Sequence, residues 1–126
     1  MNTKEVFSFP ITLEKLREIE ENYKITFPQD VVIDKAEQLV ESFAWLVVKK
    51  VLGNIDFHPD LDVDQFSAET KLSDHGFDSW DRLEFLAKIE ELLDITVFGD
   101  GEPVEEDENL TIGAVLERIK NKLLTP

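Results

Sequence analysis

Residues 34–52 constrain the fold of this chain most, because they form a helix-length segment with apolar side chains on two faces. On the first face, the apolar side chains recur at helical spacing: Ala36, Leu39, Val40, Phe43, Val47 and Val51. The second face has Trp45, Leu46 and Val48. A helix that is apolar on two faces must be covered on both. We therefore expect other helices on both sides of it, with Asp34 as its N-cap and Gly53-Asn54 at its end.

The same spacing predicts three further helices. A short helix should follow Thr12 as its cap and end near Tyr23. A second main helix should run from Ser79 to about Asp94. A last helix, capped by Thr111, should bury a regular apolar set: Ile112, Val115, Leu116, Ile119 and Leu123.

Between the two main helices lies an Asp-rich loop, residues 54–78, which we expect Pro59, Phe66 and Leu72 to anchor. Residues 104–108 could form one short helical turn, and the strand-like run at 95–98 is too short to stand alone. The sequence therefore predicts an all-α bundle with a long loop between its first and second main helices and an extra N-terminal helix. Residues 1–33 form an N-terminal arm, and residues 34–124 form the main domain.

The composition narrows the classes of partner. The 126 residues include 28 acidic and 13 basic side chains, for a net charge of −15. Such a surface repels nucleic acids and anionic membranes, and it suits basic protein partners, although acidity for solubility alone explains the charge equally well. There is no cysteine, so any thiol chemistry would have to come from a cofactor. No segment reads as a signal peptide or a membrane span, so we expect a cytoplasmic protein without membrane insertion.

The segment Leu72-Ser-Asp-His-Gly-Phe-Asp-Ser-Trp80 carries the strongest functional pattern. A Gly, an Asp and a Ser precede an amphipathic run that contains Leu83 and Leu86. Ser79 is therefore expected in the first turn of a helix, with an exposed hydroxyl. A helix N-terminus also favours a phosphate group attached at that point.

Residues 34–124 resemble the acyl carrier proteins, most strongly at Gly76-Phe-Asp-Ser79 and at the helix that follows, and less so at 95–97 and 110–113. The resemblance implies a four-helix, acyl-carrier-like bundle in which Ser79, preceded by Asp78, bears a 4′-phosphopantetheine arm. A phosphopantetheinyl transferase would add this arm from coenzyme A, and the thiol of the arm would hold an acyl group as a thioester. The protein would itself be no enzyme. It would act as a monomer that presents the acyl group to enzymes of fatty-acid, polyketide or lipid biosynthesis.

The resemblance also implies a recognition surface on the helix after Ser79, where basic patches of partner enzymes would bind. The candidates are Trp80, Asp81, Glu84, Glu90 and Glu91. A cavity for the acyl chain would be lined by a further set, although core packing explains each member better when it is taken singly: Phe85, Ile89, Leu93, Ile112 and Leu116.

Three features depart from the family pattern: Trp80 replaces the usual Leu or Met, His75 replaces a core-facing Leu, and residues 1–33 are additional. The Trp80 indole is expected either to anchor a partner or to fold onto Phe77 or Phe66. His75 is expected to cap the loop as a neutral side chain without catalytic function. The departures favour a specialised carrier. An aminoacyl or peptidyl carrier and an unmodified helical adaptor for a basic partner remain alternatives.

A metal site is not expected. Asp60, Asp62 and Asp64 alternate as in a calcium-binding loop, but Gln65 stands where the turn needs Gly, and Lys71 stands where a bidentate Glu belongs.

One internal similarity concerns the arm. Residues 13–26 and 83–96 are identical at 8 of 14 positions at a constant offset of 70. Two amphipathic helices rich in Glu, Leu and Ile would look alike through composition, and we favour that interpretation over a duplication. In either case Phe9 matches Ser79, so the first copy could not be modified.

Overall fold

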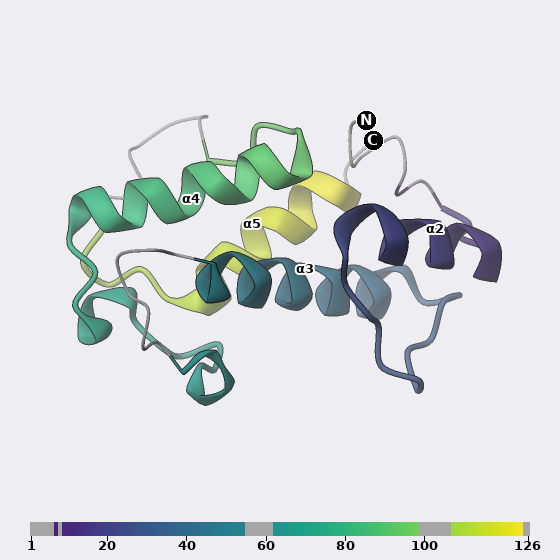
Figure 1. Ribbon diagram of the computed structural model, residues 1–126, viewed down its shortest axis with the longest axis horizontal. Helices are drawn as coiled ribbons and strands as arrows, with labels where there is room; N and C mark the ends of the chain where they lie inside the picture. Colours follow the sequence, from purple (N-terminus) through teal and green to yellow (C-terminus); the bar gives the residue numbers. More distant parts are fainter. Residues whose placement is uncertain (1–6, 8, 55–61, 99–106, 125–126) are drawn as a thin grey trace.

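A computed structural model describes residues 7, 9–54, 62–98 and 107–124 of the chain. Within them there are four α-helices: α2 (Leu13–Tyr23), α3 (Ala36–Gly53), α4 (Ser79–Leu93) and α5 (Ile112–Leu124). Two short 3₁₀ helices, η1 (Val63–Gln65) and η2 (Leu72–His75), lie in the connection from α3 to α4. Figure 1 shows α3 at the centre of the arrangement, with α4 and α5 along it and α2 over its N-terminal end. The all-α prediction is confirmed for these residues, which contain no β-strand.

The ends of the helices follow local hydrogen bonds. Thr12 caps α2, because its Oγ1 accepts a hydrogen bond from the Lys15 amide at 3.2 Å. Thr111 has the same function for α5, where its Oγ1 accepts from the Ala114 amide at 3.1 Å. At the end of α3 the Asn54 side chain donates to the Lys50 carbonyl at 2.7 Å. The helix starts at 13, 79 and 112 agree with the sequence predictions.

The predicted N-cap of α3 is wrong. Helix α3 begins at Ala36, its N-cap residue is Lys35 in an extended conformation, and no side chain caps it. The reason is a turn just upstream, in which the Lys35 amide donates to the Val32 carbonyl at 3.4 Å. Asp34 lies inside this turn and cannot cap the helix. The helix therefore begins one residue later than it would with Asp34 as its N-cap.

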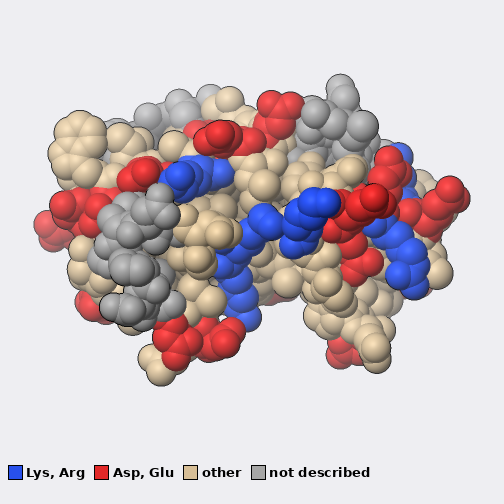
Figure 2. Space-filling view, viewed as in Figure 1, with Lys and Arg blue, Asp and Glu red and all other residues tan. Residues whose placement is uncertain are grey.

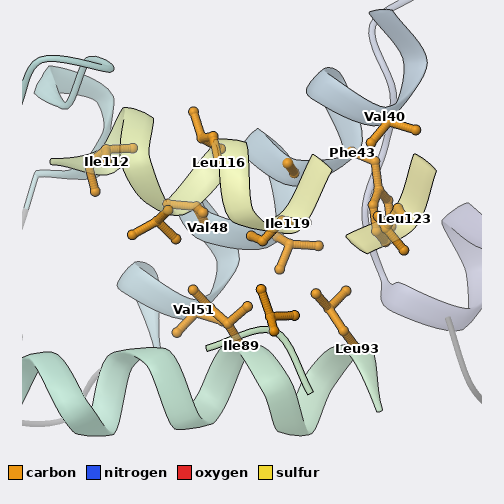
Figure 3. Packing of buried hydrophobic residues seen from close by; sticks show 14 of the residues in the cluster. Val40, Phe43, Val48, Val51, Ile89, Leu93, Ile112, Leu116, Ile119 and Leu123 are labelled. Atoms are coloured by element: carbon orange, nitrogen blue, oxygen red, sulfur yellow. The ribbon is translucent and has the colours of Figure 1, made fainter. Parts of the chain in front are cut away.

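A single hydrophobic cluster joins all four helices. Figure 3 shows Val48 and Val51 of α3 facing Ile89 and Leu93 of α4, with Ile112, Leu116 and Ile119 of α5 beside them. Every apolar residue predicted for the first face of α3 except Ala36 is buried, as is Val48 of the second face. The two-sided apolar pattern of α3 is thus explained by its central position.

The N-terminal arm belongs to the same cluster. The rings of Phe7, Tyr23 and Phe27 lie 4.7, 5.3 and 6.4 Å from the ring of Phe43 on α3, measured between centroids. We expected the arm on Trp45 and Leu46. Trp45 lines a hollow together with Pro28 and Val31 of the arm, and both Trp45 and Leu46 are half-buried. The ring contacts of the arm thus centre on Phe43.

The connection before α4 is attached to the start of α5. Lys71 and Thr111 form an isolated antiparallel β-bridge, with the Leu72 amide 3.2 Å from the Leu110 carbonyl. The predicted anchors Phe66 and Leu72 are buried, whereas Pro59 and most of the predicted turn at 104–108 lie outside the described residues. In the described part of the chain, no helix combines the length and apolar character needed to cross a membrane.

Candidate functional site

Ser79 is the first residue of α4 and is exposed. Asp78 precedes it as the N-cap: its Oδ1 accepts from the Asp81 amide at 2.8 Å, and the Asp81 carboxylate accepts from the Asp78 amide at 3.3 Å. This reciprocal pair is a capping box, which fixes where the helix starts. Because Asp78 does the capping, the Ser79 hydroxyl is not needed for it. Among the described residues the hydroxyl has no hydrogen-bond partner.

The segment before Ser79 makes a sharp turn. Gly76 ends η2 with φ 83°, in the left-handed region that favours glycine, and its amide donates to the Ser73 carbonyl at 3.3 Å. The next residue, Phe77, is buried, and its ring meets Phe85 edge-on at 6.4 Å. Gly76 thus turns the chain, Phe77 anchors it in the core, and Asp78 caps the start of α4 at Ser79.

The buried side chain of Arg82 stabilises this turn. Its side chain is only 4% exposed, and its Nη1 donates to the Phe77 carbonyl at 2.8 Å. The guanidinium therefore joins the first turn of α4 to the residue that anchors the loop. Sequence reasoning missed this role. The indication was present in the spacing, since Arg82 lies three and four residues before the buried Phe85 and Leu86 and so belongs to the buried row.

A groove of about 590 Å³ opens beside Ser79. Its walls come from η2, the first turn of α4 and the turn before α5: Lys71, Ser73, Asp74, Phe77, Asp78, Ser79, Arg82, Glu108 and Asn109. Ser73 is engaged there, with its Oγ donating to the Glu108 carbonyl at 2.7 Å. Sequence reasoning did not find residues 108 and 109, because the β-bridge at Lys71 and Thr111 brings them to the site.

The residues predicted to contact partners divide into two groups. Trp80 is 76% exposed, and Glu84 and Glu91 are exposed as well. Asp81 serves the capping box, and the Glu90 carboxylate accepts from the amides of Val97 and Phe98 at 2.7 and 3.0 Å. Trp80, Glu84 and Glu91 are therefore accessible to a partner. Asp81 and Glu90 instead form hydrogen bonds with backbone amides of their own chain.

The five residues predicted to line an acyl cavity lie together in the core. Phe85, Ile89, Leu93 and Ile112 are fully buried, and Leu116 is nearly so. Figure 3 shows Ile89, Leu93, Ile112 and Leu116 among the packed side chains of α3, α4 and α5. Each of them packs as a core residue in this structure, and their role around an acyl chain stays a prediction.

His75 lies at the end of η2 and is exposed, with its ring 4.5 Å from the ring of Phe66. It thus covers Phe66 from solvent. Among the described residues no group of three or more His, Asp or Glu side chains is arranged to hold a metal ion. Asp60 and His58 lie outside the described residues, and the Asp62 side chain accepts from the Asp64 amide at 3.2 Å.

Comparison of the chain with known proteins found no matching family model, no matching curated protein and no matching solved structure.

Proposed function

We propose that this chain is a carrier protein that receives a 4′-phosphopantetheine arm on Ser79 and presents an acyl group to partner enzymes. The observation that carries the proposal is the position of Ser79. It is the exposed first residue of α4, and its hydroxyl has no hydrogen-bond partner among the described residues. A separate residue, Asp78, caps the helix. An exposed serine at a helix N-terminus that is not needed for capping is suited to modification.

The surroundings of Ser79 are compatible with a phosphodiester. The first-turn amides of α4 favour negative charge, and Lys71 and Arg82 line the adjoining groove. Asp74, Asp78 and Glu108 line it too, so the groove does not attract phosphate strongly by charge. The covalent bond to Ser79 would attach the phosphate end of the arm. Because basic and acidic side chains of the groove offset one another, the rest of the arm would stay mobile. The arm would supply the thiol that a chain without cysteine lacks.

The exposed part of α4 supports recognition by partner enzymes. Trp80 lies beside the attachment point, and Glu84 and Glu91 extend the surface along the helix. Figure 2 shows acidic side chains along α4 and over α2. Basic patches on the transferase and on acyl-processing enzymes of fatty-acid, polyketide or lipid biosynthesis would complement this surface. We further propose that the protein acts as a cytoplasmic monomer and catalyses no acyl chemistry itself.

The test is intact-mass spectrometry after incubation with coenzyme A and a broad-specificity phosphopantetheinyl transferase. We expect the protein to gain one phosphopantetheine and the Ser79→Ala variant to gain none. Ser73→Ala is the matched control, because Ser73 lines the same groove but its hydroxyl is bound to the Glu108 carbonyl. This control variant should be modified like the original protein.

Two results would contradict the carrier proposal. One is a folded protein that gains no mass while a reference carrier in the same reaction is fully modified. The other is a gain that persists in Ser79→Ala. An unmodified adaptor that binds a basic partner through the same face of α4 would then be the better description. If the arm is added, the nature of the loaded group distinguishes an acyl carrier from an aminoacyl or peptidyl carrier.

A further inference from the structure

Helices α2 and α4 end in the same local structure. The residue after each helix, Lys24 or Asp94, is left-handed, with φ of 55° and 54°. Four residues earlier, Glu20 accepts from the Phe27 amide at 2.8 Å, and Glu90 accepts from the Val97 amide at 2.7 Å. In both cases the carboxylate reaches forward to the amide seven residues later. All of these positions are related by the offset of 70 seen in the sequence.

The buried residues of the two segments correspond as well. The matching pairs, all of them buried, are Leu16 and Leu86, Ile19 and Ile89, Tyr23 and Leu93, and Phe27 and Val97. A left-handed residue follows many helices, but a carboxylate-to-amide hydrogen bond that spans seven residues is a more specific likeness. The two segments therefore share one exit geometry in addition to their sequence identities.

The correspondence extends to exposed positions. Leu13 and Leu83 are 55% and 40% exposed, and they are two of the four large apolar residues exposed in the described part of the chain. Next to them, Glu14 matches Glu84, and about two turns further on Glu21 matches Glu91, all of them exposed. Successive residues of a helix are about 100° apart, so the Leu and the two Glu lie within a sector of about 100°. Core packing does not require these exposed residues to match.

We infer that α2 presents a second docking face of the same kind as the one on α4. The α2 face consists of Leu13, Glu14 and Glu21, and the α4 face consists of Leu83, Glu84 and Glu91. The inference rests on the proposed function only in taking α4 as the helix that partners approach. The position equivalent to Ser79 is Phe9, so the α2 face binds a partner without being modified.

The occupant of the α2 face is a basic protein segment that carries an apolar side chain. Charge complementarity indicates this, because α2 has four Glu against one Lys and one Arg in a chain of net charge −15. A second copy of the chain would place Glu against Glu. Leu13 also borders a hollow of about 440 Å³, whose apolar wall includes Phe27, Val31 and Ile33 and could receive the apolar side chain of the partner.

The two faces differ at the position between the Leu and the second Glu. Arg17 of α2 stands where α4 has Ala87, and both are exposed. A basic residue in the middle of the α2 face weakens its attraction for a basic segment. The α2 face should therefore bind more weakly than the α4 face, and removal of Arg17 should strengthen it.

The test uses an amphipathic helical peptide of Leu and Lys, about four turns long, titrated into the ¹⁵N-labelled full chain and followed by amide chemical shifts. We expect the amides of α2 to shift together with those of α4. In a variant with Leu13→Ser, Glu14→Gln and Glu21→Gln, the dissociation constant read from α2 should rise roughly tenfold. Arg17→Ala should lower it. Each substituted residue is exposed, so thermal unfolding should be unchanged.

The matched control is a variant with Val32→Ser, Glu41→Gln and Glu69→Gln, which removes the same charge and one exposed apolar side chain elsewhere. Its binding should stay within about twofold of the original. The inference is overturned if the α2 amides do not respond or if the control loses as much affinity as the α2 variant. The mass of the Ser79 adduct is measured separately, so failure of the α2 face and failure of the carrier proposal are distinguishable.

Discussion

At the scale of single residues, a close contact at Gly113 joins the start of α5 to the loop before α4. The Gly113 amide donates to the Ala68 carbonyl at 2.8 Å, and a Cβ at residue 113 would lie 2.9 Å from that oxygen. Because the oxygen belongs to the backbone, the α5 start and the loop would have to separate. We expect Gly113→Ala to lower the free energy of unfolding by about 1–3 kcal/mol, measured by urea denaturation.

Gly53→Ala is the control for this prediction, since a Cβ there would have no atom within 4 Å. It should leave stability unchanged or raise it by up to about 1 kcal/mol. Equal effects of the two substitutions would show that the contact at Gly113 is not restrictive.

Residue-scale predictions from sequence were most successful where one residue acts through its immediate neighbours. Thr12 and Thr111 cap their helices, and Ser79 lies at the first turn of α4, because capping depends on three or four residues of local chain. Glu90 was expected to face partners, and it instead binds the amides that follow the helix. The direction of a long side chain such as Glu90 depends on the path of the chain beyond the helix. Helical periodicity does not describe that path.

At the scale of elements, the exits of α2 and α4 differ in the number of hydrogen bonds that hold them. Glu90 accepts from two amides, at Val97 and Phe98, whereas Glu20 accepts from the single amide of Phe27. Hydrogen bonds to a charged acceptor contribute more than neutral ones. We expect Glu90→Ala to lower the free energy of unfolding by about 1–3 kcal/mol and Glu20→Ala to lower it by less. Urea denaturation followed by far-UV circular dichroism measures both.

The neighbouring Glu91 and Glu21 provide matched controls, because both are exposed and lie at equivalent positions. Their substitution by Ala should change stability by no more than about 0.5 kcal/mol. If Glu91→Ala costs as much as Glu90→Ala, the carboxylate contact does not hold the exit.

Element boundaries were predictable from periodicity and capping residues except at the start of α3. Asp34 was a plausible cap by residue type, but the turn from Val32 to Lys35 delays the start of α3. The attachment of residues 71 and 111 could not be foreseen either. It pairs single residues from distant parts of the chain without any strand pattern in either segment.

At the scale of the whole molecule, the N-terminal arm and the helical bundle share one core. Phe43 is fully buried, and three rings of the arm surround it. We expect Phe43→Ala to lower the free energy of unfolding by about 3–5 kcal/mol and to speed proteolysis of residues 24–35, because the arm loses the ring on which it packs. Denaturation and limited proteolysis measure the two effects.

The control for this prediction is Leu46→Ala, which removes a half-buried side chain of the same helix. It should cost less than half as much and leave the proteolysis of the arm unchanged. Faster cleavage of the arm in Leu46→Ala than in Phe43→Ala would mean that the arm depends on the second apolar face of α3. The sequence indicated that α3 needs cover on two sides, but it could not select the contact residue, since both faces are apolar.

The two tryptophans differ in exposure, so their fluorescence can report on the surface beside Ser79. Trp80 is 76% exposed beside Ser79, whereas Trp45 is half-buried with the Lys49 ammonium 5.6 Å from its ring centre. A neutral soluble quencher such as acrylamide should reach the first indole much more readily than the second. Any molecule that covers the beginning of α4 will shield that indole from the quencher. Occupancy of the site can therefore be followed in the unlabelled chain, with Trp80→Phe as the blank.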